Sequence, residues 1–136
     1  MKKHLILTSV FAVSAAAALH AQNTGPLKAN IPFDFVVDQK TMPAGEYTAE
    51  ISHQGVVILM AVDGRANAMA MSSPLQSSSL QGAGKLVFHR YADVYFLSEL
   101  WRPDTYSGSH LQTTGREREL AAAPTIQKRN TIVAVR

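Results

Sequence analysis

The sequence predicts an all-β protein, folded as a small antiparallel meander that forms a barrel or sandwich with one short C-terminal helix. Apolar and polar residues alternate with a period of two in segments that begin at Ile31, Tyr47 and Lys85. Such alternation is typical of strands that bury one face. An Asp63-Gly64 pair between two apolar segments is typical of a tight hairpin turn.

Residues 1–21 have the pattern of a secretory signal peptide. Two lysines, Lys2 and Lys3, precede an uncharged apolar run that is too short for a comfortable membrane span. Ala21 is a small residue at the expected cleavage point, and Ala18 is a second choice. We therefore expect a single β-rich domain at 22–136, periplasmic or secreted, with no integral membrane span after the signal is removed.

Charge and cysteine content exclude several classes of function. The chain has 13 Lys and Arg against 10 Asp and Glu, and the expected signal removes two lysines, which leaves 11 against 10, or a net charge of +1. Nucleic-acid binding normally requires a clustered positive surface, so we expect no nucleic-acid partner. The absence of cysteine excludes disulfides, thiol catalysis and zinc sites built on Cys.

The first half of the domain contains several candidate strands. The alternating segment from Ile31 to Val37 includes Pro32, which favours an edge or a strand start. A turn is expected over 39–45, followed by a half-exposed strand in which Tyr47, Ala49 and Ile51 face inward. The unbroken apolar run 56–62 predicts a strand that is covered on both faces.

The Asp63-Gly64 pair predicts a two-residue type I′ turn, since both central residues of that turn need positive φ. The return strand would span 65–71, although its alanines and methionines leave a helix as the competing interpretation. Residues 72–84 have no periodicity and the composition of a flexible connection, so we expect a mobile surface loop there.

The segments 85–91 and 93–101 predict a second hairpin with Ala92-Asp93 as its turn. In this register Arg90 pairs with Tyr95, and His89, Phe88 and Val87 pair with the next residues along the other strand, ending at Ser98. His89, Ser98 and Leu100 would then share one face, with Leu86, Glu99 and Trp101 on the other. Both faces are largely apolar, so we expect a central position.

One helix and one more strand are expected near the C-terminus. Thr114 and Glu117 have the spacing of a capping box, and Pro124 supplies a stop, so a helix is predicted over 116–123 and held by packing through Leu120. The alternating charges of 116–119 are interpreted as a solvated helix face. Residues 131–135 predict a last strand that covers a sheet edge.

Five sequence motifs resemble those of an uncharacterised family of small exported proteins abundant in acidobacteria. They are Ile31-Pro32-Phe33-Asp34-Phe35, Pro43-Ala44-Gly45-Glu46-Tyr47, Lys85-Leu86-Val87-Phe88-His89-Arg90-Tyr91, Tyr95-Phe96-Leu97-Ser98 and Arg116-Glu117-Arg118-Glu119-Leu120-Ala121. The resemblance covers nearly all of the domain and implies no enzymatic activity, cofactor or binding residue. The family usually has Gly where this chain has Ala92.

Two kinds of catalytic site were weighed. A serine hydrolase could use His89 as base, Ser98 as nucleophile and Asp93 as the residue that orients the base, but the chain lacks a G-x-S-x-G motif. A zinc site could use His53, His89 and His110, but no pair of them has the spacing of ligands on one helix face. We therefore assign no catalytic, cofactor-binding or metal-binding residues, and we expect no cofactor.

Aromatic residues cluster around the second hairpin, and core packing explains most of them better than a ligand surface does. They are Tyr91, Tyr95, Phe96, Trp101 and Tyr106. The favoured function is that of an exported, non-catalytic envelope or extracellular protein that binds a partner protein or a small apolar ligand. The alternative is a small serine hydrolase that uses His89 and Ser98. An empty apolar interior would favour ligand carriage, and a filled interior would favour surface interaction.

Overall fold

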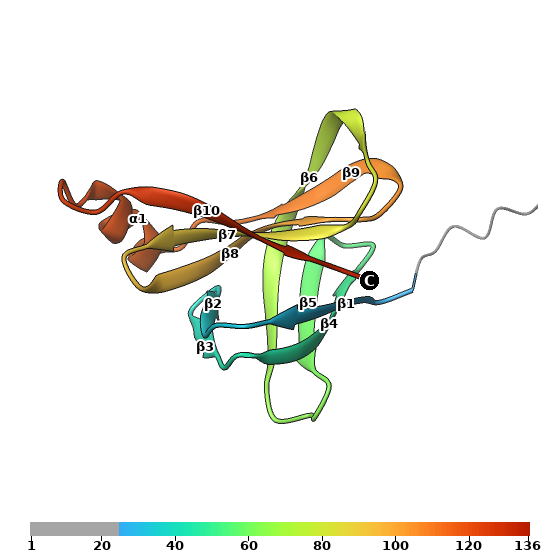
Figure 1. Ribbon diagram of the computed structural model, residues 1–136, viewed down its shortest axis with the longest axis horizontal. Helices are drawn as coiled ribbons and strands as arrows, with labels where there is room; N and C mark the ends of the chain where they lie inside the picture. Colours follow the sequence, from blue (N-terminus) through green and yellow to red (C-terminus); the bar gives the residue numbers. More distant parts are fainter. Residues whose placement is uncertain (1–24) are drawn as a thin grey trace, which may run out of the picture.

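The computed structural model describes residues 25–136 and is mostly β (Figure 1). Ten strands and one helix are present within this range. Their bounds are β1 Leu27–Ile31, β2 Phe35–Val37, β3 Lys40–Met42, β4 Gly45–Ile51, β5 Val56–Ala61, β6 Asn67–Gln81, β7 Lys85–Tyr91, β8 Val94–Trp101, β9 Thr105–Leu111, α1 Gly115–Ala122 and β10 Lys128–Ala134. The all-β class with one C-terminal helix is confirmed. The signal peptide expected at residues 1–21 lies outside the described residues.

The strands form one mixed sheet in the order β1-β4-β5-β6-β9-β8-β2-β3, with β7 on β8 and β10 on β7. Neighbouring strands are antiparallel except β2 and β8, which run parallel where Val36 pairs with Phe96. The sheet is not closed into a barrel. The predicted antiparallel meander is therefore wrong. β2 runs parallel to β8, and the pairs β1–β4, β6–β9 and β7–β10 join strands that are not consecutive in sequence.

The predicted strand from Ile31 to Val37 is two strands in the structure. β1 ends at Ile31 and β2 begins at Phe35, and Pro32 lies in the break, where its missing N–H is not needed for a ladder. Phe33 in the break stacks on Tyr95 with ring centroids 3.8 Å apart. The expected turn over 39–45 contains β3, which pairs with β2 around Asp38 at φ 56°.

The strands β4 and β5 bury one face each. Tyr47 and Ala49 are buried as predicted, and Val57 and Leu59 are fully buried. The other face of β5 is not covered, which corrects the prediction of a strand buried on both sides, because Val56 and Ile58 are half-buried and Met60 is exposed. The apolar run is continuous because this outward face is itself apolar.

The hairpin between β5 and β6 is looser than a type I′ turn. Gly64 has φ 75°, but Asp63 does not have positive φ, and the N–H of Gly64 donates to the carbonyl of Ala61. The Asp63 carboxylate accepts from the N–H of Arg65, which makes a local turn of the kind that Asp favours. The prediction of a hairpin was right and the prediction of its two-residue turn was wrong.

Strand β6 is the longest element and runs through the segment predicted to be a loop. Its first part pairs with β5, which confirms a strand and excludes the competing helix over 65–71. From Ser72 onward it pairs instead with β9, beginning with Ser72 opposite Leu111. In Figure 1, β6 extends from the lower hairpin to the upper end of the molecule. This part of β6 forms a strand because it pairs with β9, which comes much later in the chain, and its composition alone did not predict that pairing.

The second hairpin forms as predicted near its turn and departs from the prediction further along. Arg90 pairs with Tyr95, and the register continues to Phe88 opposite Leu97, but Val87 then pairs with Glu99. Ser98 is thus the extra residue of a β-bulge. The bulge moves Leu100 to the face of Leu86 and moves Glu99 and Trp101 to the face of His89, so the predicted faces are wrong beyond Ser98. Ala92 in the turn has φ 52°.

Helix α1 begins after Thr114, whose hydroxyl accepts from the N–H of Glu117, as the predicted capping box requires. The other half of the box does not form, because the Glu117 carboxylate contacts His89 and Tyr91 instead. Leu120 packs on a small cluster of Val36, Tyr91 and Phe96, which confirms its expected role. β10 pairs with β7 along its whole length and is longer than the predicted strand. Beyond it, Ala29 and Val135 form an isolated bridge between the chain end and β1.

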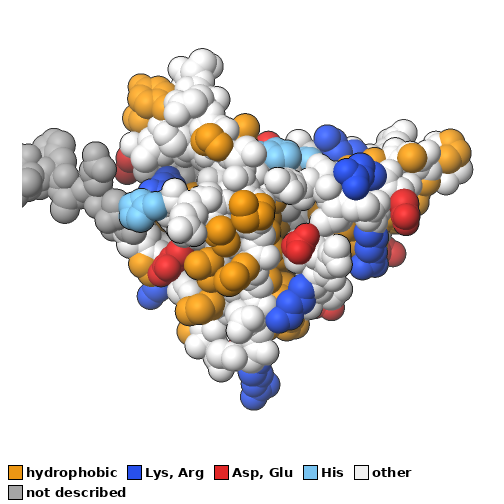
Figure 2. All heavy atoms as spheres, turned by 180° about the vertical axis from the view of Figure 1, so that it is seen from behind, with side chains coloured by type: hydrophobic (Ala, Val, Ile, Leu, Met, Phe, Trp, Pro, Cys, Tyr) orange, Lys and Arg blue, Asp and Glu red, His pale blue; other side chains and the backbone are white. Residues whose placement is uncertain are grey.

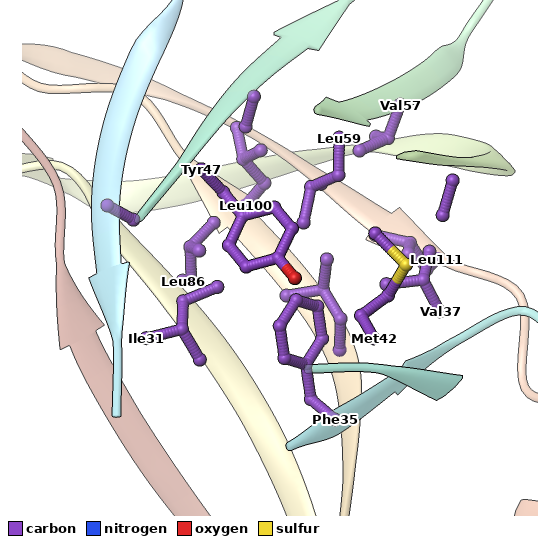
Figure 3. Close-up of a cluster of buried hydrophobic side chains, with 14 of the residues drawn as sticks. Ile31, Phe35, Val37, Met42, Tyr47, Val57, Leu59, Leu86, Leu100 and Leu111 are labelled. Carbon is purple, nitrogen blue, oxygen red and sulfur yellow. The ribbon is translucent and has the colours of Figure 1, made fainter. Parts of the chain in front are cut away.

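The interior is filled by side chains (Figure 3). Fully buried residues come from strands β1 to β5, β7 and β8: Tyr47, Phe35, Phe88, Phe96, Ile31, Met42, Leu59, Leu86, Leu100, Val37 and Val57. The rings of Phe35 and Tyr47 meet edge-on at 5.2 Å, and those of Phe35 and Phe88 at 5.5 Å. A core packed in this way leaves the outer surface as the place for interactions.

Candidate functional site

The outward face of β5 and the first part of β6 forms an apolar patch, defined here by Val56, Ile58, Met60, Met69 and Met71. Val56 lies directly opposite Met71, and Ile58 opposite Met69. Directly opposed residues of antiparallel strands project from the same face, so these side chains adjoin one another. In Figure 2, a group of hydrophobic side chains lies near the middle of the face that is drawn.

The three methionines of the patch are among the most exposed large apolar residues, with exposed fractions of 64% for Met69, 56% for Met71 and 52% for Met60. Met69 and Met71 face outward because Ala68 and Ala70, which alternate with them along β6, are buried against the core. Because the core is filled, a side chain larger than alanine would not fit at position 68 or 70. Contiguous exposed apolar surface of this kind marks interaction sites more often than isolated apolar residues do.

Polar residues border the patch on both sides. On β4, Thr48 lies opposite Met60 and Glu50 opposite Ile58, so an acidic and hydroxyl-bearing row flanks β5. On the other side, a hollow of about 260 Å³ is lined by Asp38, Val56, Met69, Ala70, Met71 and Gln112. An apolar centre with a polar rim is the usual anatomy of a protein interface.

A second candidate is the group formed by the half-buried His89 and the buried Tyr91 and Glu117. Nδ1 of His89 lies 2.7 Å from Oε1 of Glu117, and the hydroxyl of Tyr91 donates to the same oxygen over 3.2 Å. Glu117 is only 5% exposed, so the predicted solvated face over 116–119 is wrong at this residue. The group joins α1 to β7 through one carboxylate that two donors satisfy.

The Tyr91 hydroxyl is held in its neutral form. Burial raises the pKa of Tyr91 above its ordinary value, and the negative charge of Glu117 and the hydrogen bond to it raise that pKa further. A phenol that donates to a carboxylate loses that bond on ionisation, which is the physical reason for the direction. Tyr91 therefore acts as a structural donor to Glu117.

The hydrolase residues are not brought together as a triad. His89 is oriented by Glu117, whereas the Asp93 side chain is fully exposed and lies 3.8 Å from Nη2 of Arg90. Ser98 is 3% exposed and is the extra residue of the bulge, so it does not pair with Val87 as the predicted register required. Glu117, and not Asp93, contacts His89, and among the described residues no hydrogen bond joins His89 to Ser98.

The three histidines weighed as zinc ligands lie in different parts of the fold. His53 follows β4 in a turn, His89 is on β7 and His110 is on β9 opposite Glu99. Within residues 25–136, no group of three or more His, Asp or Glu side chains is arranged to hold a metal ion. That same range contains no helix long and apolar enough to cross a membrane.

The aromatic cluster around the second hairpin is mainly core, as predicted. Tyr91, Phe96 and Trp101 are buried, and Tyr95 is half-buried against Phe33. Tyr106 is 51% exposed and stands apart from this packing. Trp101 lies over Gly108 of β9 and donates from Nε1 to Glu99 over 2.7 Å.

The apolar patch and Glu117 were both missed by sequence reasoning. The alternation of Ala68 and Ala70 with Met69 and Met71 carried the signal for the patch, since small residues fit a filled interior and the methionines then face out. The spacing of Thr114 and Glu117 indicated a helix cap and gave no sign that Glu117 would be buried.

No known family model, curated protein or solved structure matches the chain.

Proposed function

We propose that this chain is an exported, non-catalytic protein of the envelope or extracellular space that binds a partner through the apolar patch on β5 and β6. The observation that carries the proposal is the exposure of Met60, Met69 and Met71 as neighbours on one sheet face. Methionine is flexible and polarisable, and it adapts to apolar surfaces of varied shape. Export rests on the signal pattern of residues 1–21, and membership of the acidobacterial family rests on the motif resemblance.

The filled interior supports surface binding over carriage of a ligand inside the sheet. Most of the buried apolar residues belong to one hydrophobic cluster inside the fold (Figure 3). A small apolar ligand could bind at the patch, in its adjoining 260 Å³ hollow. The patch is thus the expected contact for either kind of partner.

The test compares the wild-type protein with Met69→Lys and Ile132→Lys, each tagged and expressed in the native host. Both positions are exposed, at 64% and 61%, so neither change should unfold the protein, and Ile132 on β10 is outside the patch. We expect a protein or apolar ligand to be retained by the wild type and by Ile132→Lys and to be lost from Met69→Lys. Native mass spectrometry and quantitative proteomics of the purified material provide the measurement.

The same set of bound species on all three proteins would contradict the proposal. Recovery of Met1 on the mature protein would contradict export through a cleaved signal, whereas an N-terminus at Gln22 would support it. These two results are independent, so the location and the binding surface are tested separately.

A further inference from the structure

We infer that the tip of the second hairpin is a binding site for a small oxyanion, a carboxylate or a phosphate, held between Arg90 and Arg129. The two arginines lie directly opposite each other on the adjacent strands β7 and β10. Their side chains therefore project from the same face of the sheet. Like charges in this position repel each other, and a bound anion would remove that repulsion.

A hollow of about 360 Å³ lies between these residues and is large enough for a small acid. It is lined by Arg90, Ala92, Asp93, Thr125, Ile126, Gln127 and Arg129. Thr125 and Gln127 bring side chains that donate hydrogen bonds and carry no charge. The lining thus combines two guanidinium groups with neutral donors, which is the composition that anion sites use.

Arg90 is held in place before any ligand arrives. Its guanidinium carbon lies 5.2 Å from the ring centroid of Tyr95, which is itself stacked on Phe33. Nε of Arg90 donates to the carbonyl of Ala92 over 2.8 Å. The remaining N–H groups are therefore presented by a fixed side chain, which lowers the entropy lost on binding.

The local charge is positive in spite of Asp93. Its carboxylate is 3.8 Å from Nη2 of Arg90 and fully exposed. Arg129 has no carboxylate within 4.0 Å among the described residues, so no neighbouring anion offsets its charge. Asp93 competes with an incoming anion, and its removal should strengthen binding.

The experiment is an NMR titration of the isotope-labelled protein, in its naturally processed form, with inorganic phosphate and separately with acetate. Ionic strength is kept constant with chloride so that general screening does not change. We expect saturable shifts of the backbone signals of 90–93 and 125–129. If phosphate saturates at lower concentration than acetate, the site prefers a phosphate group, and the reverse order indicates a preference for a carboxylate.

Variants decide whether the arginine pair is responsible. Arg129→Gln and Arg90→Gln should each weaken binding by about tenfold, as expected for loss of one charged bidentate partner. Asp93→Asn should strengthen it. Arg65→Gln is the matched control, because Arg65 is an exposed arginine on another hairpin that lies 3.9 Å from Asp63 alone.

Absence of saturable shifts with both anions would overturn the inference. Equal weakening by Arg65→Gln would also overturn it, since the effect would then be general screening. Arg129→Gln keeps the test valid if Arg90→Gln disturbs the fold, because Arg129 is exposed and makes no ion pair among the described residues. Without added anion, Arg129→Gln should raise the urea midpoint, and phosphate should raise the wild-type midpoint.

Discussion

His89 and Glu117 are 28 residues apart and meet with Nδ1 and Oε1 separated by 2.7 Å. The contact joins the second hairpin to the first turn of α1, which at eight residues would be marginal alone. Glu117 lies near the positive end of the helix dipole and is also satisfied by the Tyr91 hydroxyl. The buried carboxylate is therefore a specific attachment of the helix to the sheet.

Removing the carboxylate should release this attachment. We expect Glu117→Ala to lower the free energy of unfolding by about 1 to 3 kcal/mol, because the donors of His89 and Tyr91 would be left without their acceptor. Urea midpoints at neutral pH measure the loss. Glu119→Ala is the control, since Glu119 is exposed on the same helix. Equal effects of the two substitutions would contradict the role of Glu117.

Stability should fall at alkaline pH because the pKa of Tyr91 is raised in the folded state, by burial first and by Glu117 second. Burial likewise raises the pKa of Tyr47, with Asp63 and Asp34 contributing. The unfolded state ionises at lower pH than the folded state and so binds fewer protons. The stabilisation is complete below the unfolded pKa of about 10 and is lost as pH rises through the folded value.

Chemical denaturation as a function of pH measures this decline. Tyr91→Phe should make the free energy of unfolding fall less steeply with pH in the alkaline range. The lost hydrogen bond to Glu117 should also lower stability at neutral pH. Tyr106→Phe, at an exposed tyrosine, should leave the profile of the wild type unchanged. If Tyr91→Phe leaves the alkaline decline in stability unchanged, the Tyr91 phenol does not contribute to that decline.

Ala92→Gly should stabilise the domain. Ala92 has φ 52°, a conformation that is strained for an L residue with a Cβ atom and free for glycine. We expect a gain of about 0.5 to 1 kcal/mol, after the larger unfolded-state entropy of glycine is included. Ala121→Gly, at an exposed helical position, should change stability in the opposite direction by a similar amount. A lower urea midpoint for Ala92→Gly would defeat the prediction.

Gly108→Ala should disrupt the contact between β8 and β9. A Cβ atom at Gly108 would lie 2.6 Å from Cε3 of Trp101 and 3.0 Å from the Leu100 carbonyl. The ring or the backbone must move, and we expect a loss of about 1 to 3 kcal/mol. The chain has one tryptophan, so its fluorescence reports the shift directly. Gly82→Ala meets nothing within 4 Å and should leave the spectrum unchanged.

The sequence alone determined the features that depend on neighbouring residues. Period-two alternation placed Tyr47 and Ala49 in the core, and the spacing of Thr114 and Glu117 placed the start of the helix. These predictions succeeded because strand faces and helix caps are set by residues a few positions apart. The pairing of Arg90 with Tyr95 succeeded for the same reason, since a short turn fixes the register next to it.

Only the tertiary structure decided the features that depend on distant partners. Residues 72–81 look like a loop but form a strand because β9 pairs with them, and β2 becomes parallel to β8 because the chain crosses the sheet. The bulge at Ser98 reverses the faces of three residues, which no alternation predicts. Glu117 is buried because His89 and Tyr91 satisfy its carboxylate. The charge pattern of the helix could not predict this, because both donors lie on a strand that is distant in sequence.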